Sequence, residues 1–409
     1  MRERHFDALV IGAGPAGSIA AIVLARAGAR VALVDKAGFP RDKACGDLIG
    51  PRGIQLLDEL GLEFDGERRL DLMVVRGPSG RAVRMPVKAG VTYPGYDLTV
   101  PRLRFDALLR DAALAAGAEP VTGRADAAIY DAGALCGVEL AGGLRLRSDV
   151  IIGADGATSR VATLAGLDDP AALLWGFAVR AYVDQPATYP QIFFWEPTPG
   201  RLFPGYGWLF PGPGGGANVG LGLGVGSDRK AGALAARAFP AFVEDLHRRS
   251  LLPARPVVSD VLGGWLKMGM RGTVPAGGRV LLVGDAAGLV NPLQGEGLSQ
   301  AMTSGRAAAE AVLAEPGRPA PRYRQALASA YDGLYQPAAR LHAALVRRPR
   351  VSSAVARVLT APGVGRSVAG AWALYWNDLV DGAPPGLDRS LAGAARRLGR
   401  QPKNASMAC

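Results

Sequence analysis

The stretch FDALVIGAGPAGSIAAIVLARAGARVALVD, residues 6–35, decides the fold. It opens with an apolar run rich in branched side chains, 6–11, which predicts a short buried parallel strand. Three glycines follow in the spacing GxGxxG, which allows a tight turn, close approach of a pyrophosphate and close packing of a helix. These are Gly12, Gly14 and Gly17. A second strand over 30–34 ends at Asp35, whose carboxylate can accept from ribose hydroxyls, so the unit predicts a nucleotide-binding domain.

Two further glycine-rich loops each follow a short buried strand. The strand over 150–152 leads into GADG, residues 153–156, and the strand over 280–283 leads into Gly284 and Asp285. Pro292, Gly295 and Gly297 follow in the third loop. Because ligands lie beyond the carboxyl ends of parallel strands, the three loops are expected to converge on one large nucleotide. An Asp at a strand end can hold a ribose or ribitol hydroxyl, while amides at the next helix N-terminus face a phosphate or a flavin carbonyl.

The charge of the chain is concentrated near its end. The net charge is +11, and residues 322–403 hold 13 Arg and Lys against 4 Asp. These cations alternate with apolar residues rather than stacking aromatics, so we expect no nucleic-acid partner. Either an amphipathic face on an anionic membrane or ordinary solvated helices would explain the pattern. Without a long apolar run or space for a signal peptide, the sequence predicts a cytoplasmic protein, with any membrane contact at the inner face.

Cysteines and histidines give little indication of metal chemistry. The cysteines suit neither a disulfide framework nor a zinc site, and no histidine lies beside a motif. These residues are Cys45, Cys136 and Cys409, and His5, His247 and His342. We therefore expect no metal ion and no catalysis by histidine, with the histidines in surface or core positions.

With GxGxxG, the DG motif and the GD motif in this order, residues 6–315 resemble the flavoproteins of the para-hydroxybenzoate hydroxylase superfamily. The resemblance implies an α/β fold with a Rossmann-like FAD-binding domain of the GR2 type, an antiparallel β-sheet substrate domain and C-terminal helices. The domains expected are FAD-binding 1–70, 97–174 and 271–320, β-rich substrate-binding 71–96 and 175–270, and a basic helical C-terminal region 321–409. The resemblance places at FAD the residues Gly12, Gly14, Ala16, Gly17, Asp35, Lys36, Arg41, Cys45, Gly46, Arg102, Asp155, Gly156, Gly284, Asp285, Pro292, Gly295, Gly297 and Leu298.

Two stretches narrow the resemblance to the geranylgeranyl reductase branch. Residues 39–47, FPRDKACGD, resemble its FPRxKxCGD loop, and residues 206–211, YGWLFP, followed by GLG at 220–222, resemble its YxWxFP and GxG signature. Within the branch the chain is most similar to the actinobacterial menaquinone reductases. The resemblance implies reduction of carbon–carbon double bonds in a prenyl lipid, quinone or other hydrophobic metabolite by hydride from reduced flavin N5. The external reductant is then NAD(P)H or a ferredoxin-type donor.

Three aromatic residues are expected to lie near the reacting bond. Tyr206, Trp208 and Phe210 alternate, so all three face one side of a strand, either as the wall of an apolar tunnel or as sheet core. Cys45 is expected beside the isoalloxazine, with a small buried core residue as the alternative. An unactivated alkene needs an acid, and the candidates are Tyr206, Cys45 or an ordered water, while the π face of Trp208 can stabilise positive charge.

Other activities are compatible with the same FAD motifs. One alternative is an FAD-dependent monooxygenase, such as an epoxidase or hydroxylase. A second is a halogenase, whose WxWxIP signature falls in the register of YGWLFP, with Lys88 as the only lysine of the region. A third is a scaffold that holds flavin without redox turnover. The CGD loop and YxWxFP favour reduction.

Overall fold

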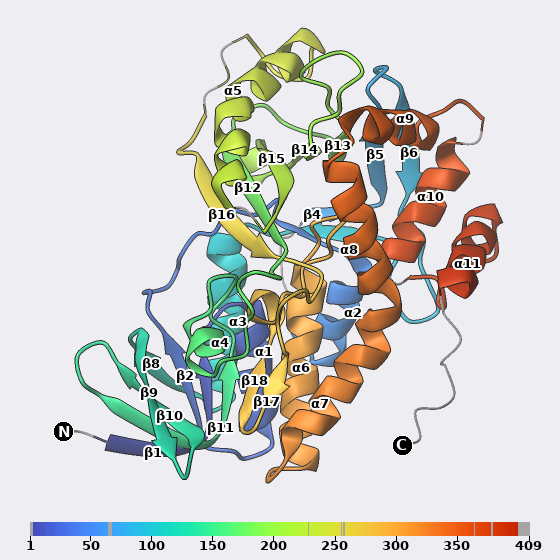
Figure 1. Ribbon diagram of the computed structural model, residues 1–409. Coiled ribbons are helices and arrows are strands. Elements are labelled where there is room, and N and C mark those ends of the chain that lie inside the picture. Colours follow the sequence, from blue (N-terminus) through green and yellow to red (C-terminus); the bar gives the residue numbers. More distant parts are fainter. Residues whose placement is uncertain are drawn as a thin grey trace.

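The computed structural model describes residues 3–63, 68–227, 229–254, 256, 258–363, 365–377 and 379–399. These residues form a parallel sheet covered by helices, a second and mostly antiparallel sheet, and C-terminal helices that pack against both (Figure 1). The predicted α/β fold class, with a parallel sheet, a second and mostly antiparallel sheet and C-terminal helices, is confirmed.

The first sheet is centred on the strand that opens the sequence. Its order is β17-β18-β11-β1-β2-β8, in which β1 pairs parallel with both β2 and β11, β11 with β18, and β2 with β8. An antiparallel hairpin, β9–β10, extends β11, and β17 pairs antiparallel with β18. The strands are β1 Glu3–Ile11, β2 Val31–Asp35, β8 Glu119–Thr122, β9 Ala125–Asp131, β10 Ala134–Leu140, β11 Arg145–Gly153, β17 Ala276–Gly277 and β18 Val280–Leu282.

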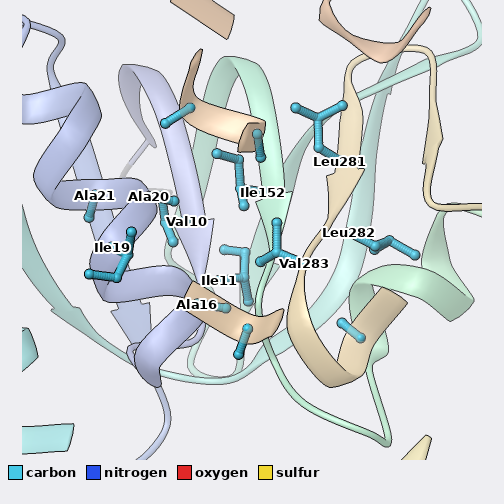
Figure 2. Close-up of a cluster of buried hydrophobic side chains, with 14 of the residues drawn as sticks. Val10, Ile11, Ala16, Ile19, Ala20, Ala21, Ile152, Leu281, Leu282 and Val283 are labelled. Carbon is cyan, nitrogen blue, oxygen red and sulfur yellow. The ribbon is translucent and has the colours of Figure 1, made fainter. Parts of the chain in front are cut away.

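Helices rich in small residues cover this sheet. Figure 2 shows Ile19 and Ala20 of the first helix beside Val10 of the sheet, with Ile152 on the neighbouring strand. This helix, α1, also packs on α6, and a Cβ at Gly305 would lie 2.1 Å from the carbonyl oxygen of Ala16, so the approach depends on glycine. The helices of this part are α1 Pro15–Arg26, α2 Pro51–Glu59, α3 Arg102–Ala115, α4 Arg160–Leu164, α6 Leu298–Ala314 and α7 Pro319–Leu327, with the 3₁₀ turn η3 Gly284–Ala287.

The second sheet has seven strands in the order β16-β12-β15-β14-β13-β5-β6, all antiparallel except the pair β13 and β5. One face of β14 packs on α5, where a Cβ at Gly207 would lie 2.1 Å from Cζ of Phe242. The opposite face is therefore free to line a cavity. The elements are β5 Leu72–Arg76, β6 Ala82–Pro86, β12 Trp175–Val183, β13 Gln191–Phe193, β14 Gly205–Pro211, β15 Ala217–Gly226, β16 Leu262–Lys267, α5 Ala233–Arg248, η1 Pro213–Gly215 and η2 Arg229–Gly232.

A small sheet, in the order β3-β7-β4, joins these two parts. Its strands are β3 Leu48–Ile49, β4 Arg68–Leu70 and β7 Asp97–Thr99, and β7 pairs antiparallel with both neighbours. Strand β3, which directly follows the CGD loop, is thus fixed beside Leu98 and Thr99. The small sheet therefore joins residues 48–49 and 68–70 to residues 97–99, which are distant in the sequence.

The C-terminal region is helical over the residues described. It comprises the π-helical turn η4 Ala328–Asp332, α8 Gly333–Val346, α9 Pro349–Leu359, α10 Gly365–Trp376 and α11 Leu387–Gly399. The last ten residues of the predicted basic region, 400–409, lie outside the described residues. Helix α8 packs on β15 and α10 on β6, so this region closes one side of the second sheet (Figure 1). Among the helices described, none is long and apolar enough to cross a membrane.

Candidate active site

The first two glycine-rich loops touch each other. Gly12 has a φ of +109°, and a Cβ at this position would lie 2.3 Å from the carbonyl oxygen of Ala154. A Cβ at Gly17 would lie 1.9 Å from the carbonyl oxygen of Gly12. Only glycine therefore permits the approach of the GxGxxG turn to the DG loop, and the predicted convergence of these two loops is present.

Asp35 fixes the nucleotide-binding turn from the end of β2. Its carboxylate accepts hydrogen bonds from the backbone N–H of Ala13 at 2.8 Å and from that of Ala37 at 2.9 Å. The guanidinium of Arg41 lies 3.8 Å from the same carboxylate. The adjacent Lys36 is exposed to solvent. Asp35 thus links the first loop to the chain that leads into the CGD loop.

Arg41 and Arg102 share one buried carboxylate. Arg102, at the start of α3, donates two hydrogen bonds to Asp106, of 2.6 and 2.8 Å, and Arg41 lies 3.1 Å from Asp106. Arg41 is also the cation beside the glycine turn, because a Cβ at Gly14 would lie 3.4 Å from its guanidinium. Arg41 thus lies beside the glycine turn, and Asp106 joins it to Arg102, for which the pyrophosphate contact is predicted.

Asp155, which is predicted to lie at the cofactor, accepts several hydrogen bonds from its own loop. Its carboxylate accepts from the Ser159 hydroxyl and from the backbone N–H groups of Arg160 and Val161, at 2.7 and 3.1 Å. These contacts hold the beginning of α4. The neighbouring Ala154 makes the contact with the first loop, and Gly156 has a φ of +82°. The DG motif therefore acts on the glycine turn through its backbone.

The third loop joins the CGD loop and the aromatic strand. Asp285 lies 3.2 Å from the ammonium of Lys43, and the N–H of Gly284 donates to the hydroxyl of Ser304 at 2.9 Å. The hydroxyl of Tyr206 donates to the carbonyl of Gln294. A Cβ at Gly295 would lie 3.0 Å from that hydroxyl, and Gly295 has a φ of +67°. The third loop therefore contacts the CGD loop through Asp285 and the second sheet through Gln294 and Gly295.

The CGD loop is held by a buried polar network that the sequence analysis missed. Asp47 is 1% exposed and has a φ of +62°. Its carboxylate accepts from the hydroxyl of Tyr182, from the side-chain amide of Asn218 at 2.8 Å and from the N–H of Arg102 at 3.2 Å. Asn218 also donates to the carbonyl of Cys45 at 2.8 Å. The only sign of this network in the sequence was Asp47 itself, the aspartate of the CGD motif.

The alternating aromatic residues of β14 line the same cavity, and two of them, Trp208 and Phe210, face the CGD loop. A Cβ at Gly46 would lie 2.9 Å from Cε2 of Phe210, and one at Gly220 would lie 2.0 Å from Cζ2 of Trp208. The rings of Tyr206 and Phe210 each lie 6.3 Å from the ring of Trp208. The first glycine of the GxG signature thus makes space for the indole.

These residues line a cavity of about 860 Å³. One side consists of the CGD loop and the third loop, including Cys45, Pro292 and Leu298. The other sides are apolar and come from the second sheet and the C-terminal helices. They include Met73, Val75, Ile192, Phe194, Phe203, Val355, Leu359 and Trp372. Helices α8 to α10 therefore belong to the cavity wall and are more than a basic solvated region.

His342 is a core histidine, one of the two positions predicted, and folding brings it beside the third loop. It is 7% exposed, lies in the cavity wall and forms a hydrogen bond with the backbone of Pro292. A Cβ at Gly224 would lie 1.9 Å from its Cε1. Burial lowers the pKa of His342, so its imidazole is neutral at pH 7. Over the described residues, no group of three His, Cys, Asp or Glu side chains could hold a metal ion.

Comparison with known proteins assigns the family. A model described as an FAD binding domain matches residues 5–177. A menaquinone reductase of Mycolicibacterium smegmatis is 36% identical over 74% of this chain and 75% of its own length. A geranylgeranyl diphosphate reductase of Rhodobacter capsulatus is 34% identical over 77% of each chain. The chain belongs to the geranylgeranyl reductase family.

A solved structure shares the fold of this geranylgeranyl reductase family member. The geranylgeranyl bacteriochlorophyll reductase-like protein of Thermoplasma acidophilum superimposes with a TM-score of 0.73 at 22% identity, over 90% of this chain and 94% of that one. The chain is an FAD-dependent oxidoreductase of the geranylgeranyl reductase type, as predicted. Lys88, considered for a halogenase, is bound to Asp388 at 2.8 Å.

Both predicted proton donors of this family member are protonated at neutral pH. Burial raises the pKa of the Cys45 thiol above its usual value. Burial, together with the nearby Cys45 and Glu296, also raises the pKa of the Tyr206 hydroxyl. The indole of Trp208 is fixed by its N–H, which donates to Asn218 at 2.9 Å. Neither donor therefore ionises readily in the physiological range.

Proposed function

We propose that this protein reduces carbon–carbon double bonds in the prenyl chain of an apolar lipid. The observation that carries the proposal is the continuous cavity of about 860 Å³, which joins the CGD and third loops to an extended apolar wall. Such a cavity suits a flexible hydrocarbon chain, since ligand cavities are lined mainly by apolar side chains with a few polar groups. The names of the relatives, which refer to menaquinone and geranylgeranyl diphosphate, support the same substrate class.

The residues present fit FAD. The turn at Gly12 and the start of α1 offer backbone N–H groups beside the cation of Arg41, which suits a pyrophosphate. We propose that Asp35 lies at the adenosine ribose, and that Asp285 and the loop before α6 lie at the ribitol and isoalloxazine. When bound, FAD supplies the two-electron reducing chemistry that amino-acid side chains lack. Cys45 and Gly46 then lie between the flavin and the aromatic wall.

The chain itself positions the alkene and excludes water. Trp208 is held by Asn218 and by the close contact with Gly220, so its ring keeps one orientation in the cavity wall. The π face of an indole attracts positive charge, which stabilises a carbon that becomes cationic as the double bond is protonated. Tyr206, held by the carbonyl of Gln294, joins this wall to the third loop. We infer that these two side chains set the position of the reacting bond.

We further propose that the protein contacts an anionic lipid surface beside α9. A hollow of about 460 Å³ is lined by Arg201, Arg348 and Arg350. The N–H of Leu202 donates to the carbonyl of Pro349 at 3.1 Å, and Leu202 also lines the substrate cavity, so the hollow lies next to it. Cations of this kind attract anionic headgroups, each contributing about 1 kcal/mol near the surface. Charge reversal of Arg348 and Arg350 should abolish sedimentation with anionic vesicles and leave neutral vesicles without effect.

The proposed activity can be tested by flavin reoxidation without oxygen. The protein is reduced anaerobically with dithionite and mixed with a polyprenyl alcohol, which has no quinone ring to oxidise the flavin, and flavin absorbance is followed. The proposal predicts that absorbance returns with unsaturated chains and not with the fully saturated alcohol. Reoxidation that requires air and a bound substrate would instead support the monooxygenase alternative.

A further inference from the structure

Asp97 is a buried carboxyl group in the wall of the cavity. It lies at the beginning of β7, where it pairs with Leu70 of β4, and it is 6% exposed. Its side chain lines the same cavity as Cys45 and Tyr206. Within the described part of the chain, neither a hydrogen bond nor a cation acts on its carboxyl group, and only burial and the charge of Glu296 do. A buried carboxylate without partners is costly, so an Asn or Leu would stabilise the fold better at this position.

A second carboxyl group lies near it, on the loop expected at the flavin. Glu296 stands between Gly295 and Gly297 and also lines the cavity. One of its oxygens accepts from the N–H of Ser299 at 3.0 Å, which holds Glu296 at the beginning of α6. Burial, and then the charge of Glu296, raise the pKa of Asp97 to about 7. Burial also raises the pKa of Glu296.

The other charged groups of the surrounding elements are engaged elsewhere. Asp47, before β3, is bonded to Tyr182 and Asn218. Arg69 of β4 lies over the ring of Tyr96, at 4.7 Å, and Arg52 of α2 lies over the ring of Tyr93, at 5.7 Å. Glu296 is therefore the charged group that, after burial, raises the pKa of Asp97, while Glu296 itself is held by Ser299 and Gln300.

Reduction of an alkene needs a proton donor that gives up its proton and is protonated again at neutral pH. A general acid works best when its pKa lies near the working pH. Cys45 and Tyr206, whose pKa values are raised above already high values, are poor matches. Asp97 matches the requirement and lines the same cavity.

We propose that Asp97 is the carboxylic acid that protonates the substrate double bond, with Glu296 as the positioning residue that keeps it protonated before turnover. The inference rests on the proposed function. In the step, the O–H bond of Asp97 breaks and a C–H bond forms at one alkene carbon. The π bond is lost, and the second hydrogen with its electron pair comes to the other carbon from reduced FAD. Asp97 ends as a carboxylate and takes a proton from water.

The first test is a titration that needs neither substrate nor turnover. Infrared difference spectra of the flavin-free protein are recorded on both sides of pH 7 for wild type, Asp97→Asn, Glu296→Gln and the exposed control Asp131→Asn. We expect a protonated carboxyl signal that disappears near pH 7 in wild type and in the control. It should be absent from Asp97→Asn and should disappear at lower pH in Glu296→Gln. A wild-type spectrum identical to that of Asp97→Asn would overturn the proposal.

The second test is a single turnover of dithionite-reduced protein with a polyprenyl lipid. Loss of the acid should slow hydrogenation about 10²- to 10⁴-fold in Asp97→Asn, with unchanged flavin content, while Asp131→Asn reacts like wild type. The wild-type rate should fall as pH rises through about 7, and the residual rate of Asp97→Asn should not. Hydrogenation by Asp97→Asn at the wild-type rate would overturn the proposed role of Asp97 and leave the proposed function of the protein standing. No hydrogenated lipid from wild type would overturn the proposed function and this inference together.

Discussion

The indole N–H of Trp208 donates to the side-chain oxygen of Asn218 at 2.9 Å, and the amide group of the same asparagine donates to Cys45 and Asp47. One side chain on β15 therefore connects the aromatic wall of the cavity to the CGD loop. Because these groups are buried, their hydrogen bonds fix one arrangement of the wall. These hydrogen bonds therefore give the shape of the cavity wall a physical cause.

The two glycines of the GxG signature should respond differently to substitution. A Cβ at Gly220 would lie 2.0 Å from Trp208, whereas one at Gly222 would lie 3.6 Å away in ordinary contact. Gly220→Ala should displace the indole, break its hydrogen bond at a cost of about 0.5–1.5 kcal/mol, and slow prenyl reduction about tenfold with FAD retained. Steady-state rates and flavin content check this, with Gly222→Ala as the control. Equal rates for the two variants would contradict it.

The approach of Gly12 to Ala154 predicts loss of the cofactor. Gly12→Ala adds a Cβ 2.3 Å from a backbone oxygen at a φ of +109°, which should destabilise the protein by more than about 1 kcal/mol and reduce bound flavin. Gly38→Ala, at a position with no atom within 4 Å, should change neither property. The ratio of flavin to protein absorbance and the thermal midpoint measure both effects. A Gly12→Ala protein with full flavin content would show that the turn does not bind FAD as described.

Much of this site could be read from the sequence because its motifs are local. The glycine turns act through backbone geometry, and the alternation of Tyr206, Trp208 and Phe210 follows from the two-residue period of a strand. Asn218 and His342 could not be found this way, because strand pairing brings Asn218 opposite Phe210 and helix packing brings His342 to Gly224. The DG motif predicts a cofactor contact for Asp155, and only the structure shows that this carboxylate also holds the beginning of α4.

Because the C-terminal helices form part of the cavity wall, we expect them to limit the length of the prenyl chain that the cavity accepts. Val355 of α9 lines the cavity, and Val358 on the same helix is 56% exposed. Val355→Trp should fill part of the cavity and lower kcat/KM for the longest prenyl chains at least about tenfold, or about 1.4 kcal/mol, with a smaller effect on short chains. Val358→Trp is the matched control. The measurement is a competition between lipids of different prenyl length, with the products identified by mass. If both variants kept the wild-type preference for chain length, the prediction would be wrong.

Asp97 should destabilise the folded protein at high pH. Its pKa is about 7 in the folded state against 3.8 for an ordinary Asp, so the folded state binds more protons between these values. The free energy of unfolding therefore falls as pH rises from about 4 to about 7, by up to about 4 kcal/mol. Asp97→Asn should remove this fall and be relatively more stable above pH 7. Urea unfolding at several pH values measures it, and parallel curves for wild type and variant would contradict the assignment.

The most direct test of the central claim is the mass of a polyprenyl quinone recovered from an anaerobic single turnover with dithionite-reduced protein. The account predicts a gain of two hydrogen atoms in the prenyl chain, absent when flavin-free protein is used. An unchanged prenyl chain, or a gain of oxygen once air is admitted, would contradict it.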